Sequence, residues 1–578
     1  MNEYIISPGF FHQDSSLITI RFPLLPRLWY TVLMMNLQFT KERYPNLYGR
    51  RILFVCRETY SKPLWFLARE LKKTNEVAAF FIMSSECTFN KCYYNEHTIF
   101  EWREKLPDVK LYDVAEICDR FVEGIKDGGD PSDQDYLDML EREYSYYKPL
   151  GLQLMASQEN TKHYHYRKYW AVTTDAENKY WLELNYKNII NILDDFKPDI
   201  ILDTDNAELQ RTVLTEVARK RDIPYATIEY GKYGFYKYPS FQNSFSIDPY
   251  FRALYEESLK KSPEELAPEY EYIRDFRAKS SIMNQEFAGS VTSQYERIPL
   301  IRSMKILLGK WNYFWDQDHT AGNASRKKKS GMLYASTPEY LKYYFDVERI
   351  KRKLLVPNKI FENPVEGERY VYMPLHLIPE SSVFVKASFY VDELNLMEQV
   401  SKSLPAGWKL YVKEHQAMLG ERDLSFYKKA SEIANVRVVQ LNYYKDPKPW
   451  ITKSEGVVTI TGTAAYEAAL MGKKSIVFGD VPFSMIDGIT RIRSFEDLPQ
   501  AIRNFGEVDN IHSAASYIHA VKEAGAEVRI FYLMDEAEEI FAGRHKETEE
   551  FHKELAVLLD FYEKGLRNYK RWKDQESS

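Results

Sequence analysis

The chain has 578 residues, too many for one ordinary hydrophobic core, so two domains, or two domains with a helical appendage, are expected. Its composition is that of a globular protein, with 44% hydrophobic, 28% charged and 15% aromatic residues. The net charge of −6 argues against general nucleic-acid binding, which needs a basic field over a whole domain.

The cysteines and the N-terminal region indicate a cytoplasmic protein. The four cysteines, all without Cys-x-x-Cys spacing, are Cys56, Cys87, Cys92 and Cys118. A disulfide framework and a zinc site are therefore not expected, and a reducing compartment suits the chain. The most apolar early window, residues 21–39, is interrupted by prolines, arginine and asparagine and falls short of the roughly 18–20 residues of a membrane span.

The first alternation of strands and helices follows an N-terminal extension over residues 1–49. A buried strand is expected at 51–56, a helix at 63–71 and a second strand at 76–83. Helical spacing among charged residues and tyrosines predicts a helical insertion at about 100–190. This pattern is the beginning of an open parallel sheet.

The alternation returns after the insertion. Strands are predicted at 200–203 and 223–228, with a helix at 209–219 between them. Residues 50–255 are therefore assigned to a doubly wound, Rossmann-like domain. In the GT-B arrangement considered below, this domain would bind the acceptor of the transferred group. Residues 256–365 break the alternation and are expected to bridge to a second domain.

A second Rossmann-like domain is predicted over residues 366–507. Its expected strands are 370–374, 410–412, 436–439, 457–460 and 476–478, with helices at 392–404, 424–434 and after residue 463. Residues 508–578 are helical in pattern to the end. The fold class expected is therefore α/β, with two doubly wound domains facing a cleft and a C-terminal helical tail. This organisation resembles the GT-B arrangement of glycosyltransferases, although one fold hosts many chemistries.

The most informative stretch, residues 456–479, reads as a βαβ unit. A short apolar strand meets the turn Thr461, Gly462 and Thr463, and an alanine-rich helix and a second strand follow. The turn places hydroxyls and free backbone N–H groups at a helix N-terminus, where the helix dipole favours an anion such as phosphate. Glu467, within the first two turns of that helix, suits the vicinal hydroxyls of a ribose. Compensation of the helix dipole is a compatible and plainer role for it.

Polar residues also follow two other predicted strands of the second domain. Lys413, Glu414 and His415 end one strand, and His376 and Glu380 follow another. Because ligands of α/β sheets collect beyond the carboxyl ends of the strands, we expect these side chains in the same nucleotide-sugar pocket. Lys413 or His415 would neutralise a nucleotide phosphate. A surface Lys-Glu-His trio and a structural histidine at 376 are the alternatives.

Candidate catalytic carboxylates cluster in the first domain. Asp203, Asp205 and Glu208 lie at a strand exit, and Glu229 ends the strand after them. Transfer of a sugar to a hydroxyl needs a base, or a carboxylate that stabilises an oxocarbenium-like centre. Helix capping by Asp205 or Asn206 is an equally weighted alternative. Asp203 and Asp205 also have Asp-x-Asp spacing, but the match is weak, and we expect no cofactor and no required metal.

Two further segments carry weaker signals about partners. The aromatic and basic segment 162–170 suits either an acceptor groove or a helix surface. The basic run Arg326–Lys329 suits either a solvated linker or contact with anionic headgroups at the inner face of a membrane.

Several of these motifs occur in the order found in capsular and surface polysaccharide biosynthesis proteins, and the chain resembles this family over about residues 370–480. The motifs are Pro374-Leu375-His376, Pro379-Glu380, Lys413-Glu414-His415, Gly420-x-Arg422 and Thr461-Gly462-Thr463-Ala464-x-x-Glu467. The family includes Kdo transferases that use a CMP-activated sugar. The resemblance implies a GT-B enzyme in which the histidine of a His-Pro motif and a Ser/Thr-rich turn grip the CMP part of the donor. Here these would be His415 and Thr461 to Thr463. The chain departs from the pattern at Gln416, where the family usually has proline, which leaves the donor open.

The expected function is that of a glycosyltransferase, cytoplasmic or at the inner face of the membrane. It would move a sugar from a nucleotide donor, CMP-linked and Kdo-like, to a surface polysaccharide or glycolipid acceptor. A sugar-nucleotide epimerase of the same two-domain architecture is the first alternative. A non-catalytic glycan-binding or assembly subunit is the second, and polyol-phosphate transfer, as in teichoic-acid polymerases, is the third.

Overall fold

The computed structural model describes most of the chain. Described are residues 39–57, 61–82, 94–156, 174–282, 337–355, 358–378, 380–441 and 443–577, together with Met304 and Leu308. Features outside these residues are residues 1–38 of the N-terminal extension, Cys87, Cys92, the segment 162–170, the run Arg326–Lys329 and Pro379. Cys56 is a buried free thiol. No helix in the described part has the length and apolar character needed to cross a membrane.

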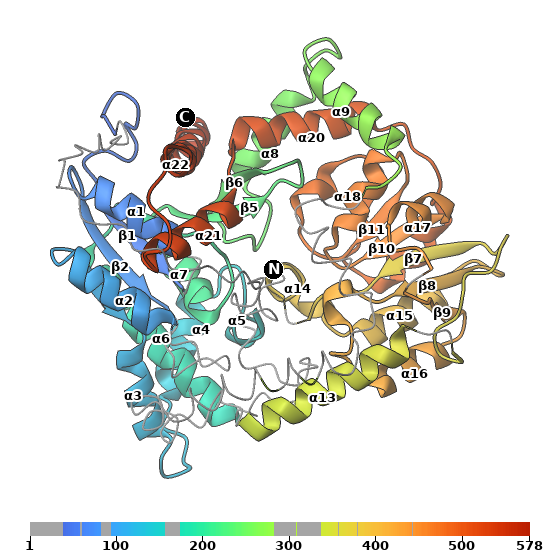
Figure 1. The fold of residues 1–578 in the computed structure, drawn as a ribbon, viewed down its shortest axis with the longest axis horizontal. Coiled ribbons are helices and arrows are strands. Elements are labelled where there is room, and N and C mark those ends of the chain that lie inside the picture. Colours follow the sequence, from blue (N-terminus) through green and yellow to red (C-terminus); the bar gives the residue numbers. More distant parts are fainter. Residues whose placement is uncertain are drawn as a thin grey trace, which may run out of the picture.

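A seven-stranded sheet forms the centre of the first domain (Figure 1). Its strands are β1 (Arg51–Cys56), β2 (Glu76–Phe81), β3 (Lys110–Asp113), β4 (Ile200–Leu202), β5 (Tyr225–Tyr230), β6 (Tyr236–Ser240) and β13 (Ala526–Glu527). They lie in the order β13-β6-β5-β4-β1-β2-β3. Strands β1 to β5 are mutually parallel, whereas β6 and β13 pair antiparallel. The nearly continuous apolar sequences of β1 and β2 fit strands that are buried on both faces.

Helices cover both faces of this sheet. They are α1 (Lys62–Leu71), α2 (Tyr94–Lys105), α3 (Ala115–Gly124), α4 (Gln134–Glu143), α5 (Leu150–Ala156), α6 (Asp175–Phe196) and α7 (Leu209–Lys220). Alternate residues of β1 enter two different cores, one with α1 and α2 and the other with α3, α6 and α7. A capping box between Thr174 and Glu177 fixes the start of α6. The predicted insertion at 100–190 is largely helical where it is described, but it also contains β3, whose four residues are only partly buried.

A six-stranded parallel sheet forms the centre of the second domain. Its strands are β7 (Tyr370–Pro374), β8 (Lys409–Lys413), β9 (Val436–Val438), β10 (Gly456–Thr459), β11 (Ser475–Val477) and β12 (Ile489–Arg491). The order β9-β8-β7-β10-β11-β12 is the Rossmann order, third-second-first-fourth-fifth-sixth. Its helices are α14 (Ser381–Lys386), α15 (Glu393–Lys402), α16 (Leu424–Glu432), α17 (Lys448–Lys453), α18 (Thr463–Leu470) and α19 (Leu498–Arg503). The sequence did not predict β12.

In the part of the bridging region that the structure describes, three helices lie between the two sheets in the chain. They are α8 (Pro249–Ser258), α9 (Ala267–Ala278) and α13 (Thr337–Leu354). Ile350 and Leu354 bury α13 against the core of the second domain. Helices α8 and α9 pack against the first helix of the C-terminal tail.

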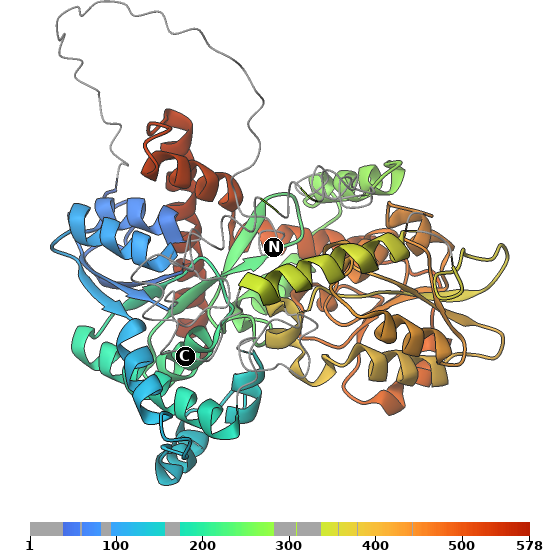
Figure 2. The ribbon, with the colours of Figure 1, turned by 60° about the horizontal axis from the view of Figure 1, so that its bottom comes forward.

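The C-terminal tail returns to the first domain. It consists of α20 (Ile511–Ala524), β13, α21 (Ile530–Phe541) and α22 (Glu549–Glu576). Leu555, Leu558 and Leu559 of α22 are fully buried in the core shared with β1, and Figure 2 shows α21 and α22 against the first domain. The Tyr562 hydroxyl donates to the backbone oxygen of Asp203 at 2.8 Å. The expected helical tail is present, with β13 as an unpredicted strand within it.

The two domains meet at contacts that we call the seam. Lys386 of α14 forms an ion pair with Glu229 at 2.7 Å, and Lys148 donates to the Ser388 hydroxyl at 3.2 Å. Val385 packs with Phe245 in a small buried cluster. The predicted fold class, α/β with two Rossmann-like domains and a C-terminal helical tail in a GT-B arrangement, is confirmed.

Candidate functional site

The strand order of the second sheet locates the site. The order reverses between β7 and β10, and open α/β sheets bind ligands beyond the carboxyl ends of the strands at such a switch point. His376 follows β7, and the turn Thr459–Thr463, hereafter the donor turn, follows β10. The topology therefore brings together two motifs that are more than eighty residues apart in sequence.

His376 holds the donor turn through its imidazole ring. Its Nε2 accepts the backbone N–H of Thr461 at 3.2 Å and lies 3.1 Å from the Thr459 hydroxyl. The Thr459 hydroxyl in turn accepts the N–H of Gly462 at 3.1 Å. Because Nε2 accepts, the ring proton is assigned to Nδ1, and Thr459 donates its hydroxyl hydrogen to Nε2. His376 therefore shapes the turn.

The donor turn presents backbone donors at the start of α18. Gly462 is the N-cap and supplies no side-chain oxygen. The Ala465 amide donates to the Gly462 carbonyl at 3.2 Å, whereas the amides of Thr463 and Ala464 make no hydrogen bond to the described residues. A side chain at 462 would collide with the Thr459 hydroxyl, which explains the glycine. The Thr461 hydroxyl oxygen is buried and makes no hydrogen bond to any described residue. This combination suits an anionic oxygen of a ligand.

A buried ionic cluster lies behind His376. Arg422 is fully buried and forms ion pairs with Glu393 and Glu414, and it donates to the backbone oxygen of His376 at 2.7 Å. The backbone N–H of His376 donates to Glu393 at 2.8 Å, and the Tyr427 hydroxyl donates to Glu414 at 2.5 Å. The cluster fixes the loop that carries His376. Glu414, which was predicted to bind the donor, therefore belongs to this supporting cluster.

The carboxylates of this cluster differ in protonation. Burial opposes ionisation of Glu393, but Arg422 and His376 outweigh it and lower its pKa. Burial dominates at Glu414 and raises its pKa to about 7, against the opposing effect of Arg422. Glu393 is therefore the permanent counter-ion of Arg422, whereas Glu414 titrates near neutral pH.

His415 and Lys413 follow β8 at the same edge of the sheet. His415 caps a short 3-10 helix, η5 (Gln416–Met418), by accepting the N–H of Ala417 at Nδ1. Burial, with nearby cationic groups, lowers the pKa of His415 to about 3, so it offers a neutral Nε2–H donor and no charge. Burial also lowers the pKa of Lys413 to about 8, so Lys413 is the cation that can neutralise a phosphate here.

Glu467 and Glu380 lie on different elements of the second domain, in α18 and just before α14. Glu467 is half-buried in the second turn of α18, and burial raises its pKa to about 7. A carboxyl group that is partly protonated can both accept and donate hydrogen bonds, which matches a pair of ribose hydroxyls. Glu380 precedes α14 and accepts the Ser382 hydroxyl at 2.7 Å. The ligand-binding roles of both residues stay predictions.

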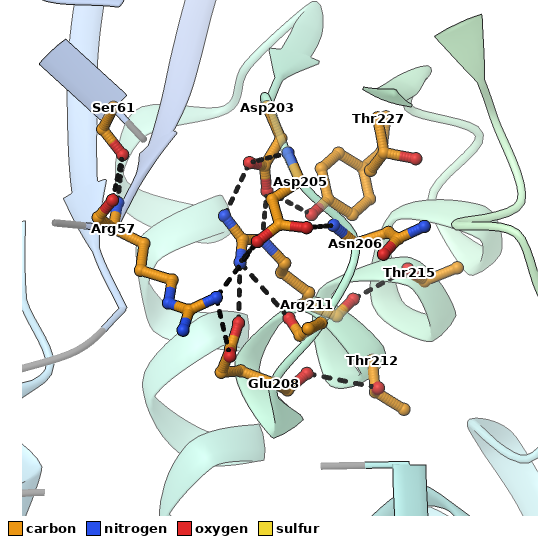
Figure 3. A network of polar contacts seen from close by, with 12 residues as sticks. Arg57, Ser61, Asp203, Asp205, Asn206, Glu208, Arg211, Thr212, Thr215 and Thr227 are labelled. Carbon is orange, nitrogen blue, oxygen red and sulfur yellow. Dashed lines mark hydrogen bonds and ion pairs between the residues drawn. The ribbon is translucent and has the colours of Figure 1, made fainter. Parts of the chain in front are cut away.

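The carboxylates predicted at the exit of β4 lie at the switch point of the first sheet, between β1 and β4 (Figure 3). Arg211 donates to both oxygens of Asp203 at 2.7 and 2.8 Å and pairs with Glu208 at 2.7 Å. Arg57 pairs with Asp205 and with Glu208, both at 3.0 Å. Two cations and three carboxylates thus satisfy one another in a region almost closed to solvent.

The charges of this network are unequal. Burial raises the pKa of Asp203, whereas at Asp205 the two arginines outweigh burial and lower it. Both carboxylates of the Asp-x-Asp spacing pair with arginine, and no group of three or more His, Cys, Asp or Glu in the described part is placed to hold a metal. Neither aspartate caps α7, whose N-cap is Glu208. Their catalytic role stays a prediction.

Glu229, the fourth predicted carboxylate, lies apart from this network at the seam. Both of its oxygens accept from Lys386 at 2.7 Å, and the Ser244 hydroxyl donates to it at 2.6 Å. Of the four candidates it is the one that contacts the second domain directly. Lys386, Glu393 and Lys232 were not singled out in the sequence. Lys232 alone had a local signal, since Gly231 and Gly234 lie close to it after the strand predicted at 223–228.

Comparison with known proteins gives only remote similarities. No protein-family model and no curated protein matches the sequence. The beta Kdo 2,7 transferase KpsC of Thermosulfurimonas dismutans is 10% identical, with a TM-score of 0.26, over 57% of this chain and 79% of that one. MnaA of S. aureus, solved with UDP, is 9% identical, with a TM-score of 0.23, over 86% of this chain and 98% of that one. The spinosyn rhamnosyltransferase SpnG is 9% identical, with a TM-score of 0.22, over 86% of this chain and 100% of that one. Because these identities and TM-scores are so low, the description of the fold and of the site depends on the geometry of this chain alone.

Proposed function

We propose that the protein is a glycosyltransferase that binds a nucleotide sugar at the donor turn and transfers the sugar to a glycan or glycolipid acceptor. The observation that supports this most is the donor turn itself. It lies at the switch point of a Rossmann-type sheet, and His376 holds it in shape. The amides of Thr463 and Ala464 and the Thr461 hydroxyl make no hydrogen bond to the described residues.

The residues divide into donor and acceptor roles. The amides of the donor turn and Lys413 would hold phosphate, His415 would donate Nε2–H to it, and Glu467 would receive the ribose hydroxyls. In the transfer, the acceptor oxygen bonds to the anomeric carbon and the bond from that carbon to the phosphate oxygen breaks. The nucleotide leaves with the electron pair, and the acceptor proton passes to a carboxylate, for which Glu229 is the candidate at the seam.

The donor is proposed to be CMP-linked, as the family resemblance implies, and the acceptor to be a surface polysaccharide or glycolipid. Titration of the purified protein with CMP, UDP and GDP by calorimetry tests the site. Thr463→Ala and Glu467→Ala should each weaken the preferred nucleotide by about 5–50-fold, because each removes a hydrogen bond to a charged or polar group worth roughly 1–2 kcal/mol.

A matched control separates local from general effects. Thr490, on the exposed edge strand β12, is distant in the sheet order from the donor turn, so Thr490→Ala should leave the affinity unchanged. Absence of binding to all three nucleotides, or unchanged affinity in both site variants, would refute the assignment. Incubation of the enzyme with donor alone distinguishes an epimerase, which would convert the donor without an acceptor.

A further inference from the structure

Lys232 is a cation of the first domain that the proposed function has not used. It lies in the connection between β5 and β6 and is half-buried. Among the residues that the structure describes, no hydrogen bond or ion pair engages its ammonium group, which lies 5.8 Å from the centre of the Tyr230 ring. A half-buried ammonium without a protein partner keeps its three donors available to an anionic ligand.

The charges around Lys232 come from both domains. Burial, and next the ammonium of Lys386, lower the pKa of Lys232, while Glu229, Glu380 and Glu467 act in the opposite direction. Glu229 is already paired with Lys386, and Glu380 accepts from Ser382. Glu467 is only partly ionised near neutral pH, since its own pKa is about 7. No nearby carboxylate is therefore a dedicated partner for this lysine.

The backbone holds Lys232 in a strained position. Its φ is 60°, in the left-handed region that non-glycine residues seldom adopt. A side chain at the preceding Gly231 would collide with Val521 of α20, so the turn lies directly against that helix. Tyr233, the next residue, packs edge-on against Tyr272 of α9 at 4.7 Å. The strain persists because packing on both sides fixes the turn.

The same packing connects the turn to the donor site. Tyr272 and Lys232 both interact electrostatically with Glu467 of α18, the helix that begins at the donor turn. Lys413, the proposed phosphate ligand, also interacts with Glu467. Tyr233 and Tyr272 also share one apolar cluster with Ala465 and Tyr466 of α18. Glu467 is therefore within electrostatic reach of Lys232 from the first domain and of Lys413 from the second.

We propose that Lys232 is a donor-binding residue supplied by the first domain and that it pairs with a second anionic group of the donor. This group is either the second phosphate of a nucleoside diphosphate or a carboxylate on the transferred sugar. The inference rests on the proposed function, since it places a further ligand at the same site. It adds that the complete donor site needs both domains and recognises two negative groups, of which the donor turn binds one.

Calorimetry with four probes tests the inference: CMP, UDP, pyrophosphate and CMP-linked sialic acid, whose sugar carries a carboxylate. Lys232→Met removes the charge and keeps most of the length. If the partner is a phosphate, the variant should bind UDP and pyrophosphate about 10–100-fold more weakly, as expected for a lost charge-assisted hydrogen bond, and CMP within twofold. If the partner is a carboxylate, the loss should be confined to CMP-linked sialic acid.

Two further variants control for folding and charge. Lys232→Arg keeps the cation and should retain affinity within about threefold of the wild type. Lys260→Met removes an exposed lysine just after α8 and should change nothing. Thermal unfolding of each variant verifies that the domains remain folded, and the arginine variant separates loss of charge from loss of packing.

The outcomes separate this inference from the proposed function. If Lys232→Met binds every probe as the wild type does, or loses CMP as strongly as UDP, the second-anion role is refuted and the glycosyltransferase proposal stands. If the wild type binds pyrophosphate but no nucleotide, and Lys232→Met weakens it, the anion site stands and the glycosyltransferase proposal fails. If the wild type binds none of the probes, both fail.

Discussion

Replacing Arg422 by methionine should destabilise the second domain and weaken nucleotide binding together. Arg422 is fully buried and is the cation between two carboxylates, Glu393 and Glu414, whose side chains are equally inaccessible. It also donates to the backbone oxygen of His376 at 2.7 Å. Methionine preserves the volume of the aliphatic part of the arginine side chain. It cannot, however, replace the guanidinium as a donor to the two carboxylates and to this carbonyl.

The magnitude follows from the burial. Removal of one partner of a buried ion pair costs about 3–5 kcal/mol, because an uncompensated charge is left inside the protein. Glu414, whose pKa is already about 7, can escape by taking up a proton. Glu393 cannot do so as easily, since His376 still favours its charged form. We therefore expect a loss of about 3–5 kcal/mol at pH 8 and a smaller loss at pH 6.

Urea denaturation followed by tryptophan fluorescence measures the effect, since Trp408 and Trp450 lie in the second domain. Calorimetry measures the accompanying loss of nucleotide affinity through the donor turn. Arg369→Met is the control, because Arg369 pairs with Glu455 at an exposed site, where the change should stay within about 1 kcal/mol. The triple variant Arg422→Met, Glu393→Gln, Glu414→Gln should regain part of the stability. A loss as small as that of the control, or no recovery in the triple variant, would refute the reasoning.

Two further predictions concern the donor turn and a titrating carboxylate. Gly462→Ala inserts a Cβ against the fully buried Thr459 and should weaken nucleotide binding by at least about 10-fold. The control variant Gly151→Ala, at an open position in α5, should leave the affinity unchanged. Calorimetry measures both variants, and equal affinities would contradict the geometry described for the turn. Burial raises the pKa of Glu216 to about 7, although the amides of residues 146–148 donate to it. Its folded pKa lies above the unfolded value near 4.3, so the folded state binds the proton more tightly and stability falls as pH rises from about 5 to 7, by at most roughly 1.4 kcal/mol per pH unit for this group. Glu216→Gln should therefore show a shallower fall in melting temperature between pH 5 and pH 8 than the wild type, and an unchanged slope would remove Glu216 as a contributor.

The sequence identified the elements that are buried and regular. Strands β1, β7 and β10 are compact apolar runs with buried residues, and each was predicted within one or two residues. Strand β6 was missed although it is mostly buried, because its sequence Tyr-Lys-Tyr-Pro-Ser contains polar residues and a proline. Strands β3, β12 and β13 were also missed, since they have two to four residues, are partly exposed and lie at sheet edges. Such strands form because an existing sheet offers unpaired backbone groups, a tertiary effect with little local signal.

The site was predictable to the extent that its residues follow strands. The donor turn and His376 each end a strand, and the strand-end rule brings them together without knowledge of the loops. Glu393 was not identified, and Arg422 was noted only as part of the motif Gly420-x-Arg422, without its supporting role. Glu393 begins a helix and Arg422 lies in a loop, so neither position is tied to a strand end. Their meeting depends on how α15 and the loop before α16 pack over β7 and β8.

The two sheets share the strand order third-second-first-fourth-fifth, but the groups at their switch points differ chemically. In the first domain Arg57 and Arg211 form ion pairs with three carboxylates. Because these groups already satisfy one another, a charged ligand would gain little binding free energy from them. In the second domain the charged groups around Arg422 satisfy one another behind His376, and the amides of Thr463 and Ala464 at the start of α18 make no hydrogen bond to the described residues. An anion gains most where donors are fixed in place and unsatisfied, because no existing bond must break and the cost of ordering the donors is already met. We therefore propose that the phosphate binds at the second domain, and that the first domain contributes Glu229 toward the acceptor and Lys232 toward the donor.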